Sequence, residues 1–463
     1  GPEDLGYRED GSMARIDKAY TWENPMSAHG LMHTVISNCY NGDPYKIDTL
    51  FMYMANMAWN SSMNTEETIK KLTEKNSDTG EYLIPRIIYS DSYYSETVAY
   101  ADLILPDTTY LERHDCISLL DRPIGEPDMV CDAIRWPVVQ PDRDVRGFQD
   151  VLLDLGVKLQ LPGMIKENGD ALYGSYADYI QQHERRPGVG PLAGFRGEDQ
   201  KSSGRGAPND NQIECYKENG GFWSEEIPLE AQYYKPWNKS YQQWAVKMGL
   251  YDAEQPFVFQ IYLEPLAKLQ KTRDLPKHLK PKKELEKRIS EKMDPLPIWW
   301  SNVDPEKAKS FPYSAITQRP AAMYHSWGSQ NIWLRQIHGS NKLFVSEDIW
   351  AKHSFTDGDW AKVTSETSSI TVPVALMRGQ NKDTIWTWNA IGKRSGTWGL
   401  AIDVDEAKKG FLLNHLISDL LPEKPDGYRW SNSDPITGQA AWYDLIVRIE
   451  KVDNKEEISL ILG

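Results

Sequence analysis

Residues 87–106 read Ile87-Ile-Tyr-Ser-Asp-Ser-Tyr-Tyr-Ser-Glu-Thr-Val-Ala-Tyr-Ala-Asp-Leu-Ile-Leu-Pro106, and this stretch decides the fold class. Its two apolar runs, Ile87–Tyr89 and Leu103–Leu105, are typical of short strands. The segment between them favours a helix, because Ser95 can cap its start and Glu96 adds a negative charge there. Strand, helix and strand in such close succession predict a compact β-α-β unit.

A second apolar run, Asp48-Thr-Leu-Phe-Met-Tyr-Met-Ala-Asn56, predicts another buried strand of the same sheet. Ligands of parallel α/β sheets bind beyond the carboxyl ends of the strands, so we expect Asn56, Ser90 and Asp91 at the rim of a binding site. A helix over 145–161 is expected to supply core residues, with Phe148, Val151, Leu152, Leu155 and Leu159 at helical spacing.

The pattern loosens from 165 to 310, which we expect to be a loop-rich and helical connecting region after an α/β domain over 1–164. The glycine-rich stretches 186–194 and 201–208 indicate loops, because neither follows a strand and opens a helix as a phosphate-binding loop does. Residues 268–292 alternate Lys and Glu with a few Leu and Ile, which predicts a solvated helix with proline breaks.

The chain from 311 to 463 is expected to be mostly β. Thr356-Asp-Gly-Asp359 is a turn signal, and strand alternation follows at 360–363, 370–376 and 385–388. A short helix over 410–421 should precede the last strand, which ends near Ile449. Several strands joined by turns suggest a closed barrel.

Composition narrows the functional classes. The formal net charge is −15, and a surface of that sign argues against binding nucleic acid or anionic lipid. The 4 cysteines lack the close spacing of a zinc or iron–sulfur site. No run of about 18 apolar residues, the length that spans a bilayer, occurs in the sequence.

Residue chemistry alone yields no active site. His29 and His33 lie one helical turn apart, but Gly30 stands where a zinc protease needs its glutamate. The stretch Thr317–Asn331 gathers cations, amides, hydroxyls and aromatic rings. Such a mixture suits either a large polar heterocyclic ligand or a polar interface, and both interpretations remain open.

The motifs nevertheless resemble a known family. Residues 95–106, followed by Glu112, resemble a signature of the dimethyl-sulfoxide-reductase family of molybdopterin oxidoreductases. Downstream, Thr317 and Arg319 with His325, then 356–359, then Asn414 with Asp434 and Gly438 resemble the dinucleotide-binding β-barrel of the same family, a barrel of the double-psi type. The ordered set of matches is more specific than any one of them.

Finer matches narrow the resemblance. Residues 110–118, 324–337 and 386–394 are most similar to the large subunit of the cytoplasmic, membrane-associated sulfite dehydrogenase group. The resemblance implies oxidation of sulfite to sulfate by oxygen-atom transfer at molybdenum. Reduction of polysulfide, thiosulfate or tetrathionate remains an alternative, as does a non-catalytic pterin-binding fragment.

The family resemblance also implies cofactors, partners and site residues. The metal, molybdenum or tungsten, would be held by two molybdopterin guanine dinucleotides. The iron–sulfur cluster and the protein ligand to the metal would lie in an amino-terminal half or a partner. Partners would be that half, an iron–sulfur subunit, one membrane-anchor subunit, and a sulfur oxyanion as substrate, with a cytoplasmic location at the inner membrane. The expected cofactor-binding residues are Asn56, Ser61, Asp91, Glu96, Thr317, Arg319, His325, Ser326, Arg335, Asn389 and Asn414.

Overall fold

The computed structural model describes most of the chain, with gaps. The described residues are 4–59, 63–117, 129–182, 210–226, 243–244, 246–249, 253–254, 261–271, 275–299, 301, 304–323, 328, 331–389, 391–392 and 410–452. The side chains of Ile117, 129–132, 222–226 and Arg335 lie outside the description. The glycine-rich stretches 186–194 and 201–208 lie outside it as well.

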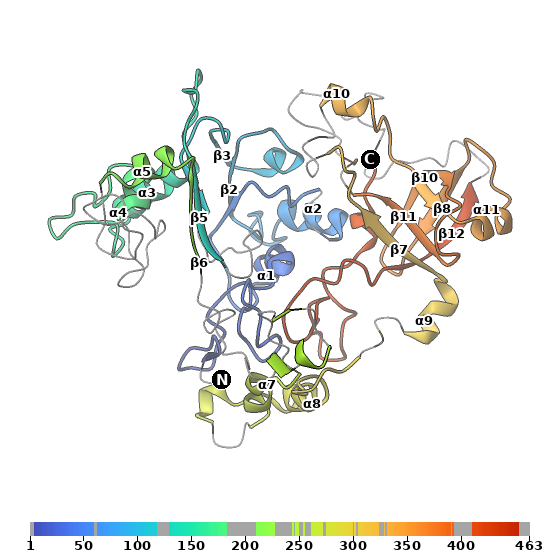
Figure 1. Cartoon of the computed structure of the whole chain (residues 1–463). Coiled ribbons are helices and arrows are strands. Elements are labelled where there is room, and N and C mark those ends of the chain that lie inside the picture. Colours follow the sequence, from blue (N-terminus) through green and yellow to red (C-terminus); the bar gives the residue numbers. More distant parts are fainter. Residues whose placement is uncertain are drawn as a thin grey trace. The chain divides into compact units, whose positions relative to one another are not determined.

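The chain forms two compact units (Figure 1). The larger unit comprises Gly1–Tyr89, Tyr93–Ile104 and Ile261–Gly463. The smaller unit comprises Ser90–Ser92 and Leu105–Gln260. The larger unit is therefore discontinuous in sequence, with the smaller one inserted into it.

The predicted strand–helix–strand succession is present. The elements are η2 (Met32–Thr34), α1 (Val35–Asn41), β1 (Thr49–Tyr53), α2 (Thr65–Thr73), β2 (Arg86–Asp91), η3 (Glu96–Tyr100) and β3 (Leu103–Pro106). The three strands form a sheet in the order β1-β2-β3. The predicted helix after Ser95 is a single 3-10 segment, η3, rather than an α-helix.

Alternation along the strands builds the core of this layer. Ile87 and Tyr89 of β2 are 2% and 0% exposed, and Leu50 and Met52 of β1 are buried with them. Apolar residues of α1, α2 and η3 complete the same cluster. Burial of these side chains is the main stabilising contribution to the layer.

The smaller unit contains a three-stranded sheet that the sequence did not indicate. Its elements are β4 (Asp115–Ile117), β5 (Met129–Arg135), α3 (Phe148–Lys158), α4 (Tyr176–Gln182), α5 (Gln212–Glu218) and β6 (Phe222–Glu226). The strands are antiparallel in the order β4-β5-β6.

Helix α3 confirms the helix predicted over 145–161, but its predicted core face is wrong. Leu152 and Leu159 are exposed, whereas Leu153 and Gly156 are buried. The buried face follows from the chain beyond the helix, which places Met164 against Gly156. Helical spacing alone does not reveal which face of the helix the following chain will cover.

The lysine-rich region forms short helices, and the first three of those named next bury an apolar side. The elements are α7 (Glu264–Leu269), η6 (Lys277–Leu279), α8 (Lys283–Lys292) and α9 (Pro305–Ser310). Leu279, Leu285 and Ile289 are buried, while the lysines between them face solvent. The predicted solvated helix with proline breaks is thus confirmed.

The carboxy-terminal region is a closed barrel of six strands, as predicted. Its strands are β7 (Tyr313–Gln318), β8 (Leu343–Val345), β9 (Trp360–Thr364), β10 (Ser369–Leu376), β11 (Thr384–Trp388) and β12 (Ile446–Val452). They close in the order β10-β8-β11-β7-β12-β9, with β10–β8 and β11–β7 parallel and the other pairs antiparallel. The same region contains the helices α10 (Ile332–Arg335), α11 (Glu347–Lys352) and η9 (Leu413–Leu416).

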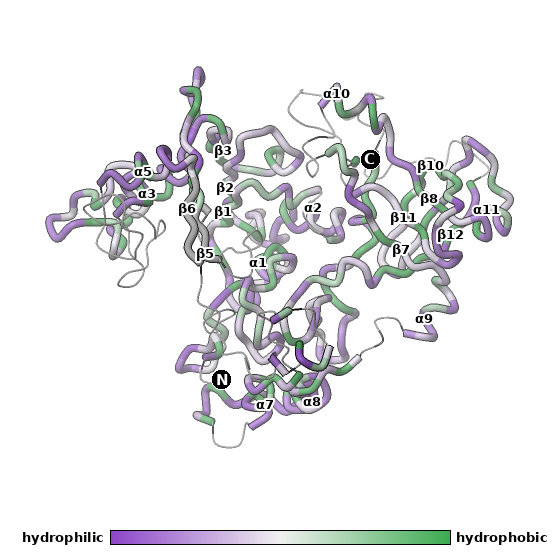
Figure 2. The backbone as a smooth tube through the Cα atoms, in the orientation of Figure 1, coloured by the Kyte–Doolittle hydropathy of each residue, from purple (hydrophilic) through white to green (hydrophobic). Residues whose placement is uncertain are grey.

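The barrel interior is apolar, and green dominates its strands in Figure 2. The turn at 356–359 is confirmed: the Thr356 amide donates to Asp359 Oδ2 at 2.6 Å, and Gly358 has φ +90°. The turn joins α11 to β9 rather than two paired strands. The helix predicted over 410–421 is wrong, because only η9 is helical there and its neighbours are buried as irregular chain.

None of the helices among the described residues is long and apolar enough to cross a bilayer.

Candidate functional site

The loop after β1 is joined to the start of η3 by Asn56. Its side-chain Nδ2 donates to Glu96 Oε2 at 2.7 Å, and its Oδ1 accepts from Thr97 Oγ1 at 2.7 Å. The structure therefore brings two predicted site residues, Asn56 and Glu96, into direct contact. Because Asn56 is 7% exposed and its amide is engaged on both sides, it positions the loop rather than presenting a free group.

Asp91 closes β2 and is 8% exposed. It belongs to the smaller unit, where its carbonyl oxygen accepts from the Asp107 amide at 3.0 Å. It is thus at the carboxyl end of a strand, as predicted, but it is not placed relative to the barrel residues.

Sequence reasoning missed the ion pair that organises the loop after β3. The Arg113 guanidinium binds Asp107 Oδ2, and both side chains are buried, at 6% and 0% exposure. Asp107 Oδ1 accepts from the amides of Thr108 at 2.7 Å and Phe148 at 2.9 Å. A buried charge is tolerated when an opposite charge and hydrogen bonds compensate it, as they do for the Asp107 carboxylate. The sequence did contain one signal for this ion pair, namely an aspartate that directly follows an apolar strand and a proline.

Glu112, part of the family signature, also has a structural role. It accepts from the Thr109 amide at 2.8 Å and from Arg143 at 2.6 Å. The Arg143 guanidinium lowers the pKa of Glu112 to about 2. Asp107 and the signature residue Glu112 therefore shape one loop of the smaller unit.

Parallel pairing of β7 with β11 assembles one end of the barrel. Thr317 lies opposite Thr387 in the register, and the Asn389 amide extends the pairing by donating to the Gln318 carbonyl at 3.0 Å. Thr317, Arg319 and Asn389 consequently emerge side by side where the two strands end. Their side chains make no hydrogen bond or ion pair with any described residue.

Asn341 anchors the loops at this end of the barrel. It is 1% exposed, and its Nδ2 donates to the carbonyls of Trp388, Ile391 and Phe411 at 2.9, 2.9 and 3.0 Å. Its Oδ1 accepts from Thr387 Oγ1 at 2.7 Å. One buried amide thus holds the segments that carry Asn389 and, three residues beyond Phe411, Asn414.

Two glycines let these loops approach closely. A Cβ on Gly410 would lie 2.7 Å from the Ile391 carbonyl oxygen and 2.8 Å from the Gly392 nitrogen. A Cβ on Gly392 would lie 2.9 Å from the Phe411 carbonyl oxygen. Real Cβ atoms do not come this close, so the loops can meet here only because both residues are glycine.

The loop after β1 reaches the same end of the barrel. Trp59 Nε1 donates to the Gly392 carbonyl at 2.7 Å, and the Asn64 amide donates to the Asn414 carbonyl at 2.9 Å. The Trp59 and His415 rings pack edge to face, 4.9 Å apart. Within the larger unit, Trp59 and Asn64 therefore bring this part of the chain against the barrel loops.

The donor chemistry at this barrel end fits a large polar ligand with anionic groups. Arg319 is an exposed cation, Asn389 is half-buried with a side-chain amide that bonds to no described residue, and Thr317 adds a hydroxyl. Guanidinium, amide and hydroxyl groups are the types that bind pyrophosphate and read heterocycle edges. Ser61, His325 and Ser326 lie outside the described residues, as does the Arg335 side chain.

The histidine pair does not form a metal site. The chain becomes helical only at Met32, so His29 and His33 do not share a helix face. His33 Nε2 instead lies 2.9 Å from Ser431 Oγ. Within the described ranges, no group of three or more His, Cys, Asp and Glu side chains could hold a metal ion.

Asn341, Gly392 and Gly410 shape this end of the barrel, and the sequence did not reveal their role. Gly410 was placed at the start of the helix predicted over 410–421, and single glycines are a weak signal because they are common in loops of every kind. Asn341 follows Ser340 in an unremarkable polar stretch. Its side chain donates to three carbonyls that are distant in sequence, so no local sequence pattern could indicate its role.

The barrel and the α/β layer have a counterpart among solved structures. No protein-family model matches the chain. Acetylene hydratase from Pelobacter acetylenicus has a similar fold, with a TM-score of 0.53, 15% identity and coverage of 94% of this chain and 48% of that one.

A curated protein is similar at the level of sequence. A sulfite dehydrogenase subunit from Allochromatium vinosum is 45% identical over 460 residues, which are 98% of this chain and 48% of that protein. The chain thus spans about half the length of the relative that it matches. Along nearly all of its own length, the chain is similar to one part of a sulfite dehydrogenase subunit.

Proposed function

We propose that this chain is the cofactor-binding, carboxy-terminal portion of a molybdenum oxidoreductase that oxidises sulfite to sulfate. The observation that carries the proposal is the 45% identity with the sulfite dehydrogenase subunit over 98% of the chain. The similar fold of acetylene hydratase and the six-stranded barrel are consistent with it. The proposed cofactor is a pair of molybdopterin guanine dinucleotides, one bound at the end of the barrel, which we take to be of the double-psi type.

The proposed reaction combines sulfite and water to give sulfate, two protons and two electrons. Bound molybdenum and its pterins would supply the oxygen-atom transfer and accept the electrons, and the protein would supply position and electrostatics. Arg319 would neutralise a pyrophosphate, and Asn389 and Asn414 would hydrogen-bond heterocycle edges. Thr317 would add a hydroxyl contact next to Arg319.

The α/β layer would hold the second dinucleotide. The Asp91 carboxylate can accept both N–H groups of a guanine edge. Asn56 and Glu96, which bond to each other, would fix the loop that leads to Ser61 rather than bind the cofactor directly. His325, Ser326 and Arg335 remain proposed contacts on the strength of the family motif.

The proposed assembly follows from the same relative. That protein is named as one lettered subunit of its enzyme, which implies further subunits. We propose an iron–sulfur subunit that takes the electrons, and with it a membrane anchor. The assembly would be cytoplasmic, at the inner membrane. The four-iron cluster and the metal ligand would come from the remaining half of the relative's length.

Elemental mass spectrometry tests the proposal on the complete polypeptide, purified from its native source. We expect about one molybdenum per polypeptide, together with reduction of an electron-accepting dye that depends on sulfite. Substituting Arg319→Ala should lower the molybdenum content. Arg378→Ala is the matched control, because Arg378 is also exposed but lies in the turn before β11, at the opposite end of that strand.

Two results would argue against the proposal. A metal-free complete polypeptide would favour a non-catalytic pterin-binding module. A metal-loaded polypeptide that ignores sulfite but reoxidises a reduced dye with polysulfide, thiosulfate or tetrathionate would show the opposite direction of catalysis.

A further inference from the structure

An apolar patch is exposed on the larger unit, next to α7 and α8. Two short stretches form it, one directly before α7 and the other shortly after α8. Its members are all large apolar side chains: Ile261, Tyr262, Leu263, Leu296, Ile298 and Trp299. Trp299 is 83% exposed, more than any other large apolar side chain among the described residues. Clusters of this kind on a protein surface mark interaction sites.

Hydrogen bonds and prolines hold the two stretches side by side. The Leu263 amide donates to the Pro295 carbonyl at 2.8 Å, which joins one stretch to the other. The Leu296 amide donates to Asp294 Oδ1 at 2.8 Å, and Pro295 and Pro297 restrict the backbone on either side of Leu296. A surface that is fixed in this way loses little conformational entropy when a partner covers it.

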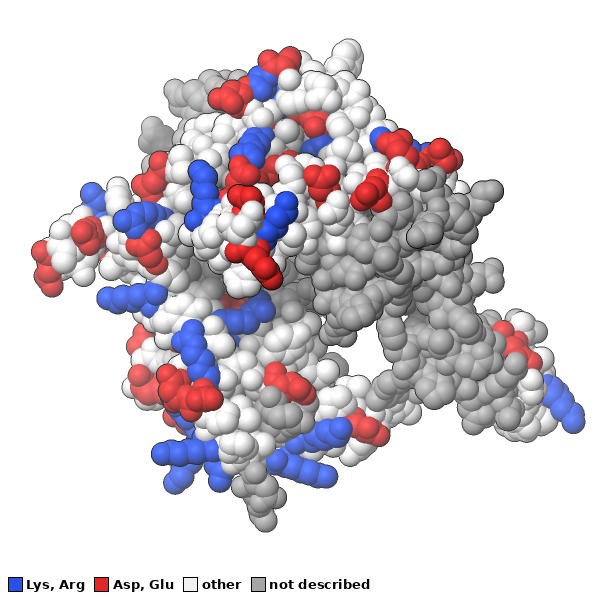
Figure 3. Space-filling model, turned by 90° about the vertical axis from the view of Figure 1, so that its left-hand side faces the viewer, with Lys and Arg blue, Asp and Glu red and all other residues white. Residues whose placement is uncertain are grey.

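The helices beside the patch are charged on their exposed sides, whereas the patch contains no charged side chain. Lys268 of α7 and Glu284 and Lys287 of α8 are exposed. Figure 3 shows basic and acidic side chains together along the lower part of the face, at the level of α7 and α8 in Figure 1. Because both signs occur there, charge does not favour a nucleic acid or an anionic lipid as the partner. The contact that the patch offers is apolar.

The beginning of the chain packs against the same two helices (Figure 1). Leu5, Tyr7 and Trp22 belong to an apolar cluster whose other buried members come from α7, α8 and the residue after α8: Leu266, Leu269, Leu285, Ile289 and Met293. Helices α7 and α8 therefore contact the amino-terminal stretch on their buried side and lead directly into the patch at their ends.

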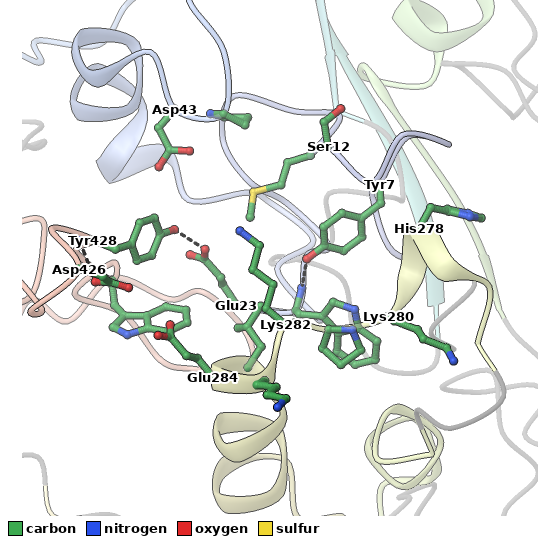
Figure 4. A pocket seen from close by; sticks show the side chains of 18 of the residues that line it. Tyr7, Ser12, Glu23, Asp43, His278, Lys280, Lys282, Glu284, Asp426 and Tyr428 are labelled. Carbon is green, nitrogen blue, oxygen red and sulfur yellow. Dashed lines mark hydrogen bonds between the residues drawn. The ribbon is translucent and has the colours of Figure 1, made fainter.

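Further contacts fix the amino-terminal stretch in this place. Trp22 Nε1 donates to the Leu279 carbonyl at 2.8 Å, and the Arg288 guanidinium donates to the Glu23 carbonyl at 3.1 Å. This stretch and the start of α8 face each other across a cavity of about 600 Å³ (Figure 4). The helices have 6 and 10 residues, which makes them about 9 and 15 Å long. A segment that leads into the amino-terminal stretch would therefore start close to the patch.

We propose that the segment preceding Gly1 in the complete polypeptide covers this patch with apolar side chains of its own. The inference rests on the proposed function, in which this chain is the carboxy-terminal portion of a longer polypeptide. The match covers only 48% of the relative's length, which leaves ample chain for such a segment. A covalently attached segment has a high effective concentration at a nearby surface, which favours it over a separate partner.

The rate of cysteine labelling in the complete polypeptide tests whether the patch is covered. We expect a maleimide to label Trp299→Cys about tenfold more slowly than Lys287→Cys, because only local opening would expose a covered thiol. Lys287 is the matched control, since it lies on α8, is 78% exposed and is not part of the patch. Ile298→Cys is a second variant, for use if Trp299→Cys lowers the melting temperature.

Photo-cross-linking identifies what covers the patch. Benzoylphenylalanine in place of Trp299 should cross-link to residues upstream of Gly1, and the product should migrate as a single polypeptide. Mass spectrometry of the cross-linked peptides locates those residues. The same photoreactive residue in place of Lys287 should give no cross-link to that segment.

Several outcomes would overturn the proposal. Cross-links from position 299 to a second copy, to a separate subunit or to lipid would each do so, as would equal labelling rates for Trp299→Cys and Lys287→Cys. The proposed function is tested separately, by molybdenum content and by sulfite-dependent reduction of a dye. A metal-free polypeptide with cross-links upstream of Gly1 would argue against the proposed function but support the covered patch.

Discussion

At the scale of single residues, Asn341 is the position where a substitution would break a large set of buried hydrogen bonds. Its two N–H groups serve three main-chain carbonyls, and its oxygen serves donors on Lys342, Thr387 and Trp388. Replacing the amide by a carboxylate keeps the shape but sets a negative charge against those carbonyls. The barrel loops would then lose their common anchor.

We therefore expect Asn341→Asp to reduce the free energy of unfolding by about 2–4 kcal/mol, the range typical of breaking a buried hydrogen-bond network. Urea denaturation measures the change. Asn381→Asp is the control: Asn381 is exposed in a turn, where its oxygen accepts one amide hydrogen bond. A loss of similar size in both variants would contradict the special role of Asn341.

His33 makes stability depend on pH. Burial lowers its pKa to about 4 from the ordinary value of 6.5. Between these two values the unfolded chain binds a proton that the folded chain does not, so the free energy of unfolding falls as pH falls. Each unit of difference corresponds to about 1.4 kcal/mol, which gives about 3 kcal/mol over the whole window.

Chemical denaturation at pH 7, 6 and 5 should show this loss, and His33→Gln should reduce the slope. His29→Gln changes an exposed histidine nearby and should leave the slope as it is. An unchanged slope in His33→Gln would place the pH dependence elsewhere.

At the scale of elements, the close approach of the two barrel loops depends on Gly410. An alanine there would place its Cβ 2.7 Å from the Ile391 carbonyl oxygen, so one loop must move. We expect Gly410→Ala to cost about 1–3 kcal/mol, as overpacking does. Thermal unfolding monitored by calorimetry gives the value. Gly379→Ala is the control, because nothing lies within 4 Å of a Cβ at Gly379; equal effects would refute the argument.

The elements also show how far sequence patterns reach. Strands β1, β2 and β9 to β12 follow from apolar runs and alternation, because the side chains of a strand point to opposite faces in turn. Strand β3 was also predicted from an apolar run, but its Leu103 and Ile104 are exposed. The helix predicted over 410–421 was wrong because burial there does not alternate with exposure. Phe411, Leu412, Leu413 and Leu416 are all buried, so their spacing reflects enclosure on every side rather than one helix face.

Sequence patterns reach the candidate site only at strand ends. Asn56 and Asp91 lie at or just beyond strand ends, as the sequence suggested, whereas Thr317 and Asn389 were chosen from the family resemblance alone. The barrel order could not be predicted, because the paired residues of β11 and β7 lie 70 positions apart in sequence, as in Thr384 and Ser314. Asn341 was missed for the same reason, since its partners come together only in the closed barrel.

At the scale of the whole molecule, a buried ion pair links the α/β layer of the larger unit to the chain beyond η9. Lys71 Nζ lies 3.8 Å from Asp419 Oδ2, and Ser37 bridges them, accepting from Lys71 at 2.8 Å and donating to Asp419. Both charged side chains are almost fully enclosed, at 10% and 5% exposure. Removing one partner leaves the other charge buried alone.

We expect Lys71→Met to cost about 3–5 kcal/mol, the usual penalty for breaking a buried pair. The double variant Lys71→Met/Asp419→Leu should be less destabilised than the sum of the single variants, because it removes both charges. Denaturation followed by tryptophan fluorescence gives the free energy of unfolding of the unmodified protein, of both single variants and of the double variant. These four values form the double-mutant cycle. Additive effects would show that the pair does not couple the two regions.

The position of β12 has a consequence for how the protein is made. This strand pairs with both β7 and β9, so it fills the last place in the ring. While a ribosome is still translating the preceding residues, β7 and β9 each present an open edge of unpaired amide and carbonyl groups. Such edges recruit other strands and promote aggregation. The nascent chain must therefore be shielded until residues 446–452 leave the exit tunnel, and a premature stop before Ile446 would yield a sheet that cannot close.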